Sequence, residues 1–265
     1  MIKLSAVIPS YKDPLLVKTI DSLLENSELG DQLEVIAVLD GYWPTFELRI
    51  DPRVRYVHLG GNRGMRGAIN AGVAVARGEF LMRNDEHQMY GKGYDRILTE
   101  TCEPNWIVTP RRYALDPIKW EIMKDILPID FMRLKIVNVS EGVRKFSGVE
   151  TPGDDNQLIQ ESMAMQGSCW LMSHKWWDEV IGELQTEGYG PHYQDSHEMV
   201  FKTWKAGGKL MVNKNTWHAH KHRTFPRTHN NGTIENPANS EAGWKYSLDT
   251  WGEYYEKEIR PRWGI

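Results

Sequence analysis

The order of apolar segments in residues 1–100 constrains the fold of this chain more than any other feature. Short apolar runs of the kind that form buried strands cover residues 4–11, 33–41, 54–60 and 79–85. Two segments with helical spacing lie among them, at residues 13–27 and 66–78, and the second is rich in small side chains. Strands that alternate with helices predict an α/β fold with a mainly parallel central sheet flanked by helices.

The rest of the chain shows the same kinds of segment, separated by longer irregular stretches. Residues 111–165 mix apolar and polar pieces, and the turn-rich part at 150–157 is expected to be an exposed loop. The later segments are predicted to be a strand at 168–172 that leads into a helix, a helix at 195–208, a strand at 209–213, an extended stretch at 217–223, a polar loop at 225–243 and a helix at 244–259.

Composition excludes several classes of protein. The formal net charge of −4 gives no general electrostatic attraction to nucleic acid. No stretch approaches the roughly 20 apolar residues that cross a bilayer, and the N-terminus is too short and too interrupted for a secretory signal. The two cysteines, Cys102 and Cys169, make no disulfide framework and suit a reducing compartment. We therefore expect no membrane anchor and a cytoplasmic location.

Acidic residues stand where two of the predicted strands end. Asp40 closes the strand at 33–41, and Asp85, Glu86 and His87 follow the apolar part of the strand at 79–85. In parallel sheets, ligands bind at the carboxyl ends of the strands. Alternate residues of an extended segment point the same way, so Asp85 and His87 would share one face, and this pair suits Mn²⁺ or Zn²⁺. A turn-forming Asp40 and a solvated loop at 85–87 are the alternatives.

Three histidines alternate along the extended stretch at 217–223. His218, His220 and His222 would all face one side of that segment. A solvated or pH-sensitive face is one interpretation, and a local zinc site is another. A catalytic metal that keeps positions open for substrate oxygens fits better, because structural zinc sites often include cysteine and none is near.

In their order along the chain, these motifs resemble those of family 2 glycosyltransferases and their relatives with the GT-A fold. The stretch NRGMRGAINAGVAVARGEFLMRNDEH is similar to the family's Asn-x-Gly-x-x-x-Ala-x-Asn-x-Gly segment, followed by a strand and an Asp-x-Asp motif. AVIPSYKDP is similar to the family's first strand and nucleotide-binding turn. VIAVLDG is similar to its strand ending in Asp-Asp-Gly-Ser, with Leu39 and Tyr42 replacing the first acid and the serine. The resemblance implies that the donor is bound by Pro9, Ser10, Tyr11, Asp40, Asn62, Arg66 and Asn70.

The resemblance also implies how the chain is organised. It predicts a Rossmann-like GT-A fold in a single domain that covers residues 1–265. The nucleotide-binding half would be residues 1–100 and the acceptor-binding half residues 101–224, followed by a lid loop and a C-terminal helix at 225–265. We expect residues 225–243 to order over the bound donor, because long polar loops of this kind often act as lids.

The Asp-x-His form of the motif resembles the polypeptide N-acetylgalactosaminyltransferases, which hold Mn²⁺ with such a pair and a distant histidine. Their later segment has a Phe-Arg-x-Trp helix, two glycines, a strand and Gly-His-Val-Phe-Arg. The segments of this chain that are similar to these, in the same order, are FKTW at 201–204, Gly207–Gly208, KLMVN at 209–213 and the histidine-rich stretch at 217–223. The resemblance implies that Asp85, His87 and His220 hold Mn²⁺ or Mg²⁺, and that Arg223 contacts the donor diphosphate.

The activity implied by the resemblance is a metal-dependent hexosyltransferase. It would move a sugar from a nucleotide-diphosphate sugar, first of all a UDP-sugar, to a hydroxyl group of a saccharide, a protein, a small molecule or a modified DNA base. Asp195 and Glu198 are the candidate catalytic acids. Gln194 stands where inverting members carry an acid, so inversion and retention both stay open. The alternatives are a nucleotidyltransferase and a non-catalytic sugar-binding module, and the sequence leaves the oligomeric state open.

Overall fold

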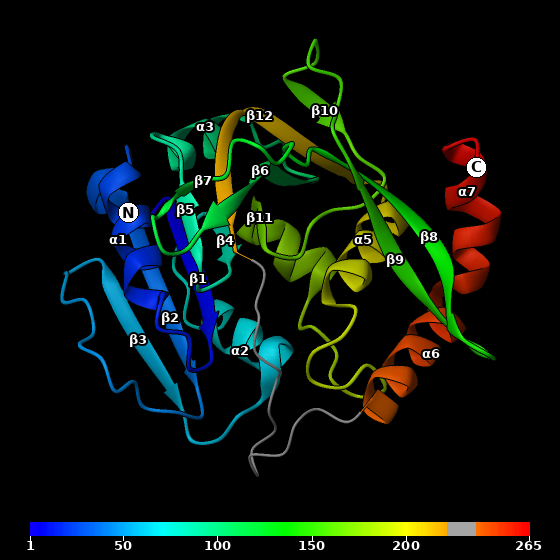
Figure 1. Cartoon of the computed structure of the whole chain (residues 1–265), viewed down its shortest axis with the longest axis horizontal. Coiled ribbons are helices and arrows are strands. Elements are labelled where there is room, and N and C mark those ends of the chain that lie inside the picture. The colour runs from blue at the N-terminus through cyan, green and yellow to red at the C-terminus, as the bar shows by residue number, and fades with distance from the viewer. Residues whose placement is uncertain (222–236) are drawn as a thin grey trace.

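A ten-stranded sheet runs through the middle of the protein (Figure 1), whose computed structural model describes residues 1–221 and 237–265. Neighbouring strands follow the order β10-β12-β6-β11-β4-β1-β2-β3, with β5 beside β12 and β7 beside β6. The strands are β1 (Leu4–Ser10), β2 (Leu33–Asp40), β3 (Val54–Leu59), β4 (Phe80–Asn84), β5 (Gln88–Tyr90), β6 (Trp106–Asp116), β7 (Glu121–Ile122), β10 (Ile159–Glu161), β11 (Cys169–Ser173) and β12 (Lys209–His220).

The predicted mainly parallel sheet with flanking helices is confirmed. Strands β4, β1, β2 and β3 pair in parallel, and so do β6 and β12. Strand β11 lies between these two parallel groups and runs antiparallel to both β4 and β6. The helices are α1 (Leu16–Asn26), α2 (Gly64–Val73), α3 (Tyr94–Thr101), α4 (His174–Trp176), α5 (Asp195–Lys205), α6 (Pro237–Tyr254) and α7 (Arg260–Arg262), with short turns η1 (Gly30–Gln32), η2 (Trp177–Ile181) and η3 (Tyr255–Ile259).

Alternation along the strands divides the core between the two faces of the sheet. In β1, Ala6 and Ile8 pack in the cluster that contains the apolar faces of α1 and α3, whereas Val7 packs in the cluster that contains α2 and α5. The small-residue helix predicted at 66–78 does approach the sheet closely. A side chain at Gly72 would lie 2.4 Å from Val7 Cγ1, so only glycine fits there.

The middle of the chain contains a hairpin that the sequence did not predict. Strands β8 (Phe131–Ser140) and β9 (Val143–Thr151) form a separate two-stranded antiparallel sheet, and α6 packs on β9 (Figure 1). The helix α3 was also missed. The exposed loop predicted at 150–157 is confirmed for residues 152–157, which are mostly exposed, whereas Glu150 and Thr151 belong to β9.

Two expectations for the C-terminal part need correction. The segments at 209–213 and 217–223 were predicted separately, but a single strand, β12, runs from Lys209 to His220 with a register shift between Asn213 and Trp217. The polar loop predicted at 225–243 is wrong for residues 237–243, which belong to α6, while residues 222–236 lie outside the described part of the chain.

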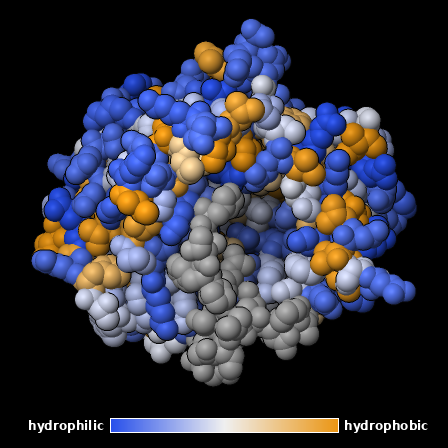
Figure 2. Space-filling model, viewed as in Figure 1, coloured by the Kyte–Doolittle hydropathy of each residue, from blue (hydrophilic) through white to orange (hydrophobic). Residues whose placement is uncertain are grey.

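Exposed hydrophobic residues are dispersed over the described surface. Trp43, Ile50, Ile118 and Leu127 are the most exposed large ones besides Met1, and they come from three loops, with Trp43 and Ile50 in the loop between β2 and β3. On the face in Figure 2, hydrophobic residues lie in small groups among hydrophilic ones. Within the described residues, no helix has the length and apolar character needed to span a membrane.

Candidate functional site

The candidate site lies at the sheet edge where β1, β2, β4 and β12 end. Because β11 is antiparallel to both β4 and β6, strand β6 and its parallel partner β12 point the same way as β4. Asp85 follows the last residue of β4, and His220 is the last residue of β12. Strand β5 pairs antiparallel with β12 and sets His220 opposite Gln88, which brings the end of β12 against the 85–87 segment.

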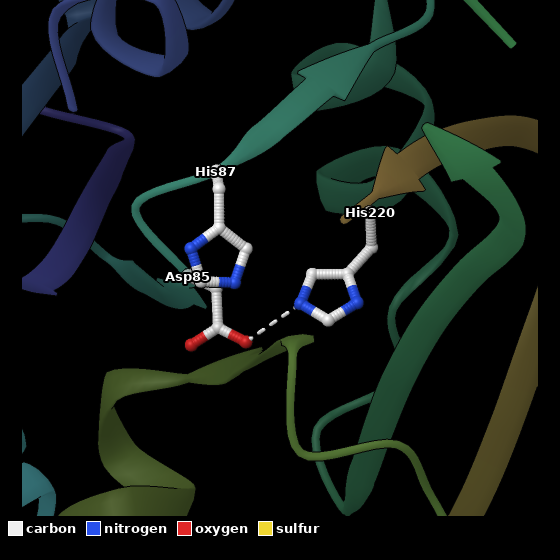
Figure 3. Close-up of side chains that lie close together, drawn as sticks. All are labelled: Asp85, His87 and His220. Carbon is white, nitrogen blue, oxygen red and sulfur yellow. Dashed lines mark hydrogen bonds and ion pairs between the residues drawn. The ribbon is translucent and has the colours of Figure 1, made fainter. Parts of the chain in front are cut away.

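Asp85, His87 and His220 converge at this edge (Figure 3). Each offers a ligand atom, and these atoms lie within 4.8 Å of one another. Nε2 of His220 is 3.0 Å from Oδ2 of Asp85, although the two residues are 135 positions apart, and the imidazole ring centroids of His87 and His220 are 5.0 Å apart. Both histidines are buried, while the Asp85 side chain is 23% exposed. The structure therefore brings together the three residues that the sequence predicted as metal ligands.

The charges around Asp85 keep its carboxylate ionised. Arg83 donates from Nη2 to Oδ1 of Asp85 at 2.6 Å. Burial alone would raise the pKa of Asp85, but the Arg83 charge and the hydrogen bond with His220 hold that pKa well below its ordinary value. Burial lowers the pKa of His220 to about 4. At neutral pH the carboxylate is thus ionised and the imidazole neutral, as metal ligation requires.

The donor set fits a transition-metal ion. One carboxylate and two imidazoles are typical ligands for Mn²⁺ and Zn²⁺, whereas Ca²⁺ prefers oxygen alone. Three protein ligands leave coordination positions open for substrate oxygens. The 85–87 segment connects β4 to β5 and bends at Glu86 and His87. Asp85 and His87 lie with His220 in one cluster, while Oε2 of Glu86 accepts a hydrogen bond from the backbone nitrogen of Tyr11 at 2.8 Å.

His218 does not belong to this cluster. Its side chain is fully buried, and its Nε2 lies 3.3 Å from Oγ of Ser168. Burial holds the pKa of His218 well below its ordinary value, so the ring is neutral at neutral pH. Of the alternating histidines, His220 reaches Asp85, His218 does not, and His222 lies outside the described residues.

The comparisons with known proteins agree with this arrangement. The model of the family described as glycosyl transferase family 2 matches residues 5–181, well over half of the chain. The chain belongs to glycosyl transferase family 2. Among solved structures, it is similar to GalNAc-T7 with UDP, GalNAc and Mn²⁺, with a TM-score of 0.74 and 15% sequence identity.

That likeness shows the GT-A fold alone, because the sequence identity is low. It covers 98% of this chain and 50% of the GalNAc-T7 chain, so the family 2 protein spans about half the length of that relative. A comparison with curated protein sequences gives no match.

Asp40 at the end of β2, and Asn62 and Asn70 of the family motif between β3 and β4, make hydrogen bonds to the backbone of this protein. Oδ1 and Oδ2 of Asp40 accept hydrogen bonds from the backbone nitrogens of Arg63 and Gly64, at 2.6 and 2.9 Å, at the start of α2. Nδ2 of Asn62 lies 3.4 Å from the carbonyl oxygen of Asp40. Asn70 exchanges two hydrogen bonds of 2.9 Å with the backbone of Leu184. These contacts fix both ends of α2.

Two further predicted residues, Arg66 and Glu198, form an ion pair in the interior. Both side chains are at most 2% exposed, and Nη1 of Arg66 donates to Oε2 of Glu198. Arg66 also donates to the backbone oxygens of Gln185 and Tyr193, and its guanidinium lies 4.2 Å from the ring centroid of Tyr189. The predicted donor-binding role of Arg66 and catalytic role of Glu198 stay predictions, and the contacts add a structural role to both.

The turn after β1 lies beside the metal cluster. Pro9 is half-buried, and Oγ of Ser10 shares a hydrogen bond with the hydroxyl of Tyr42, whose ring meets that of Tyr11 edge to face at 5.8 Å. The backbone of Lys12 has a φ of +59°, the left-handed region that non-glycine residues rarely adopt. The sequence-predicted donor residues of this turn thus stand next to the 85–87 segment.

Asp195 begins α5 next to the same region. It is 6% exposed, and its Oδ2 has no hydrogen-bond partner among the residues that the structure describes. A side chain on Gly167 would lie 3.8 Å from this oxygen, and the carbonyl oxygen of Gly167 accepts a hydrogen bond from Arg83. The preceding Gln194 has a φ of +56°, a strained conformation of the kind found at functional sites. Arg223, the predicted diphosphate contact, lies outside the described residues.

Sequence reasoning missed three charged residues of the site. Asp13 is 1% exposed and lies against His87, Arg83 holds Asp85, and Arg112 of β6 is buried beside β12. An arginine within an apolar strand was a signal for Arg83, because a buried guanidinium needs a charged partner. Asp13 stands at the start of the helix predicted at 13–27, where an acid is a common capping residue, and nothing in the sequence pointed to His87.

Proposed function

We propose that this protein is a metal-dependent hexosyltransferase that moves a sugar from a UDP-sugar to a hydroxyl acceptor. The observation that carries the proposal is the convergence of Asp85, His87 and His220 at the carboxyl edge of the sheet. Membership of glycosyl transferase family 2 supports the reaction class. The solved relative with UDP, GalNAc and Mn²⁺ supports the choice of nucleotide and of Mn²⁺, or Mg²⁺ in its place, as the cation.

The chain's own residues divide the work at this site. Asp85, His87 and His220 would hold the cation, and Arg83 keeps the carboxylate of Asp85 ionised and oriented. The cation held by these residues would supply positive charge that neutralises the leaving diphosphate. The turn at residues 9–11 lies beside these ligands and would bind the nucleotide, and we assign Arg223 to the diphosphate because a guanidinium fits phosphate oxygens with two parallel hydrogen bonds.

Asp195 is our candidate for the base that takes a proton from the acceptor hydroxyl. A general base needs an oxygen that is not already engaged, and within the described part of the chain Oδ2 of Asp195 meets this condition. Asp195 lies near Gly167, whose carbonyl oxygen accepts a hydrogen bond from Arg83, the residue that binds Asp85. In a retaining reaction no such base is needed, so the Asp195 variant also tests the stereochemical course.

The first experiment measures hydrolysis or transfer with a panel of UDP-, GDP- and dTDP-sugars, with Mn²⁺ and with EDTA. Wild type should release free UDP from a UDP-sugar only when the metal is present. His220→Ala and Asp85→Asn should each lower the rate by roughly 100- to 1,000-fold, the usual cost of removing one electrostatic contact to a transition state. His218→Gln is the matched control, because His218 is a buried histidine of the same strand outside the cluster.

The products separate the proposal from its alternatives. A nucleotidyltransferase would form or consume inorganic pyrophosphate and release no UDP, and a non-catalytic module would bind the donor without turnover. Equal turnover in EDTA, or by the Asp85 and His220 variants, would contradict the metal assignment. Anomeric configuration of the product, read by NMR, then decides the role of Asp195: inversion together with a large loss in Asp195→Asn supports the base, and retention opposes it.

A further inference from the structure

The interaction that fixes His87 comes from a residue outside the predicted ligand set. Oδ2 of Asp13 lies 2.9 Å from Nδ1 of His87, and both side chains are almost completely buried, with 2% and 4% of their surface exposed. In Figure 3 the other ring nitrogen of His87 faces Asp85 and His220, and Nδ1 faces away from them. The two nitrogens of one ring are thus divided between Asp13 and the metal cluster.

Asp13 is itself held firmly in place. Its Oδ1 accepts a hydrogen bond of 2.9 Å from the backbone nitrogen of Leu15, immediately before the first turn of α1. The left-handed backbone of Lys12 turns the chain between Tyr11 and Asp13. Tyr11 donates its backbone N–H to Glu86, so the turn and the 85–87 segment are joined twice, once in each direction. Strain of this kind persists only where surrounding contacts enforce it.

A carboxylate that receives the Nδ1 hydrogen of a histidine determines the tautomer of the ring. An ionised carboxylate can only accept hydrogen bonds, so Asp13 requires the proton on Nδ1 and leaves the lone pair on Nε2. Metal-ligating histidines commonly have such a second partner, which orients the ring and increases its basicity.

Asp13, Glu86 and His87 form a second group whose potential ligand atoms lie within 4.8 Å of one another. The carboxylate oxygens of this group already accept hydrogen bonds from the backbone nitrogens of Tyr11 and Leu15, and Oδ2 of Asp13 faces His87. These contacts favour a role for Asp13 in orienting His87 over a second metal site at this position.

We propose that Asp13 is a positioning residue that fixes the Nδ1–H tautomer of His87 and so keeps Nε2 available as a metal ligand. This inference rests on the proposed function, because it takes His87 as a ligand. Asp13 acts through the His87 ring and has no direct part in binding the metal or the substrate. The strained turn at residues 10–13 would then have two roles. It would present the backbone of Ser10 and Tyr11 to the donor, and it would place the carboxylate of Asp13 where it orients His87.

The variant Asp13→Asn tests the proposal with little change of shape. With the amide oxygen kept on the Leu15 N–H, the amide nitrogen would face Nδ1 of His87 as a donor and favour the Nε2–H tautomer. We expect Mn²⁺ affinity, measured by EPR titration of free Mn²⁺, to fall roughly 10- to 100-fold, as for other outer partners of metal-ligating histidines. Asp95→Asn is the matched control, since Asp95 is a fully buried carboxylate in α3 that binds Ser27 and the backbone of residues 28 and 29.

A second readout needs neither metal nor activity. Nitrogen-15 NMR of the metal-free protein, with His87 assigned by comparison with His87→Gln, should show the proton on Nδ1 in wild type and in Asp95→Asn, and on Nε2 in Asp13→Asn. A wild-type His87 with its proton on Nε2, or a folded Asp13→Asn that binds Mn²⁺ as tightly as wild type, would overturn the proposal. If wild type itself fails to bind Mn²⁺, the proposed function fails, while the tautomer measurement still decides whether Asp13 controls His87.

Discussion

Two groups of residues that the same family resemblance indicated have different hydrogen-bond partners in the structure. At the ends of β4 and β12, the ligand atoms of Asp85, His87 and His220 lie within 4.8 Å of one another, and the hydrogen-bond partners of Asp85 are the side chains of Arg83 and His220. Around α2, the polar groups of Asp40 and Asn70 are already satisfied by backbone groups of this protein. The first group is arranged for a ligand, and the second fastens a helix to the rest of the fold.

One stretch of family motif can therefore contain residues that are placed to bind a metal and residues that attach a helix to the fold. The metal cluster is assembled at the ends of β4 and β12, and α2 contacts it through Met65, whose sulfur lies 3.0 Å from Nη2 of Arg83. We call Asp40 and Asn70 the fastening group, because they attach α2 to the rest of the fold. Arg66 and Glu198 extend this group, because they join α2 to α5 through a buried ion pair. We expect variants of the fastening group to lose stability and variants of the metal group to lose metal affinity and turnover.

The largest stability effect is expected for Arg66→Met. This change leaves Glu198 with Lys202 as its remaining cation among the described residues and removes the hydrogen bonds to Gln185 and Tyr193. Breaking a buried ion pair by removing one partner costs roughly 3–5 kcal/mol, which urea denaturation will measure. The exposed Arg63→Met, three residues earlier, is the control and should change stability by less than about 0.5 kcal/mol. A folded Arg66→Met with wild-type stability and weakened donor binding would reverse the assignment.

Asp40 provides a pH test of the same comparison. Burial raises the pKa of Asp40 to about 6, from an ordinary value of 3.8. The folded chain therefore binds this proton more tightly than the unfolded chain does, so the contribution of Asp40 to stability decreases as the pH rises from about 4 to about 6 and then levels off. A pKa difference of about two between the folded and the unfolded chain corresponds to about 3 kcal/mol of unfolding free energy. Carbon-13 NMR should show the carboxyl of Asp40 titrating near pH 6, and Asp40→Asn should flatten this part of the stability curve. Titration near pH 4 in the folded protein would contradict it.

The smallest of these effects is expected for Asn70→Ala. The change leaves the backbone N–H and carbonyl of Leu184 without their side-chain partner, which costs roughly 1–3 kcal/mol for a buried pair. Thermal or urea unfolding will measure the loss, with Asn156→Ala in the exposed loop at 152–158 as the control. Mn²⁺ affinity should stay at the wild-type value. A drop in that affinity without a drop in stability would move Asn70 to the ligand-binding group.

Apolar periodicity was sufficient to predict β1, β2 and β4, because these strands are buried on both faces and read as continuous apolar runs, but it predicted no strand for β6, which pairs in parallel with β12. The hairpin of β8 and β9 was missed although apolar and polar residues alternate over residues 132–136 of β8, which is a strand signal, whereas β9 alternates weakly. Asp85 and His87 lie in one cluster, as the Asp-x-His spacing predicted, but the connection between β4 and β5 is bent where the sequence predicted an extended segment. The contact of Asp13 with His87 depends on the left-handed turn at Lys12, a conformation that no local pattern signals.

Direct measurement of Mn²⁺ binding tests the central claim of this account, that Asp85, His87 and His220 form one metal centre. In an EPR titration, wild type and His218→Gln should bind one Mn²⁺ with equal affinity. His220→Ala should bind it more than roughly 100-fold more weakly, beyond the usual cost of losing an outer partner, while its far-ultraviolet circular dichroism stays unchanged. Binding by His220→Ala with wild-type affinity would contradict the account.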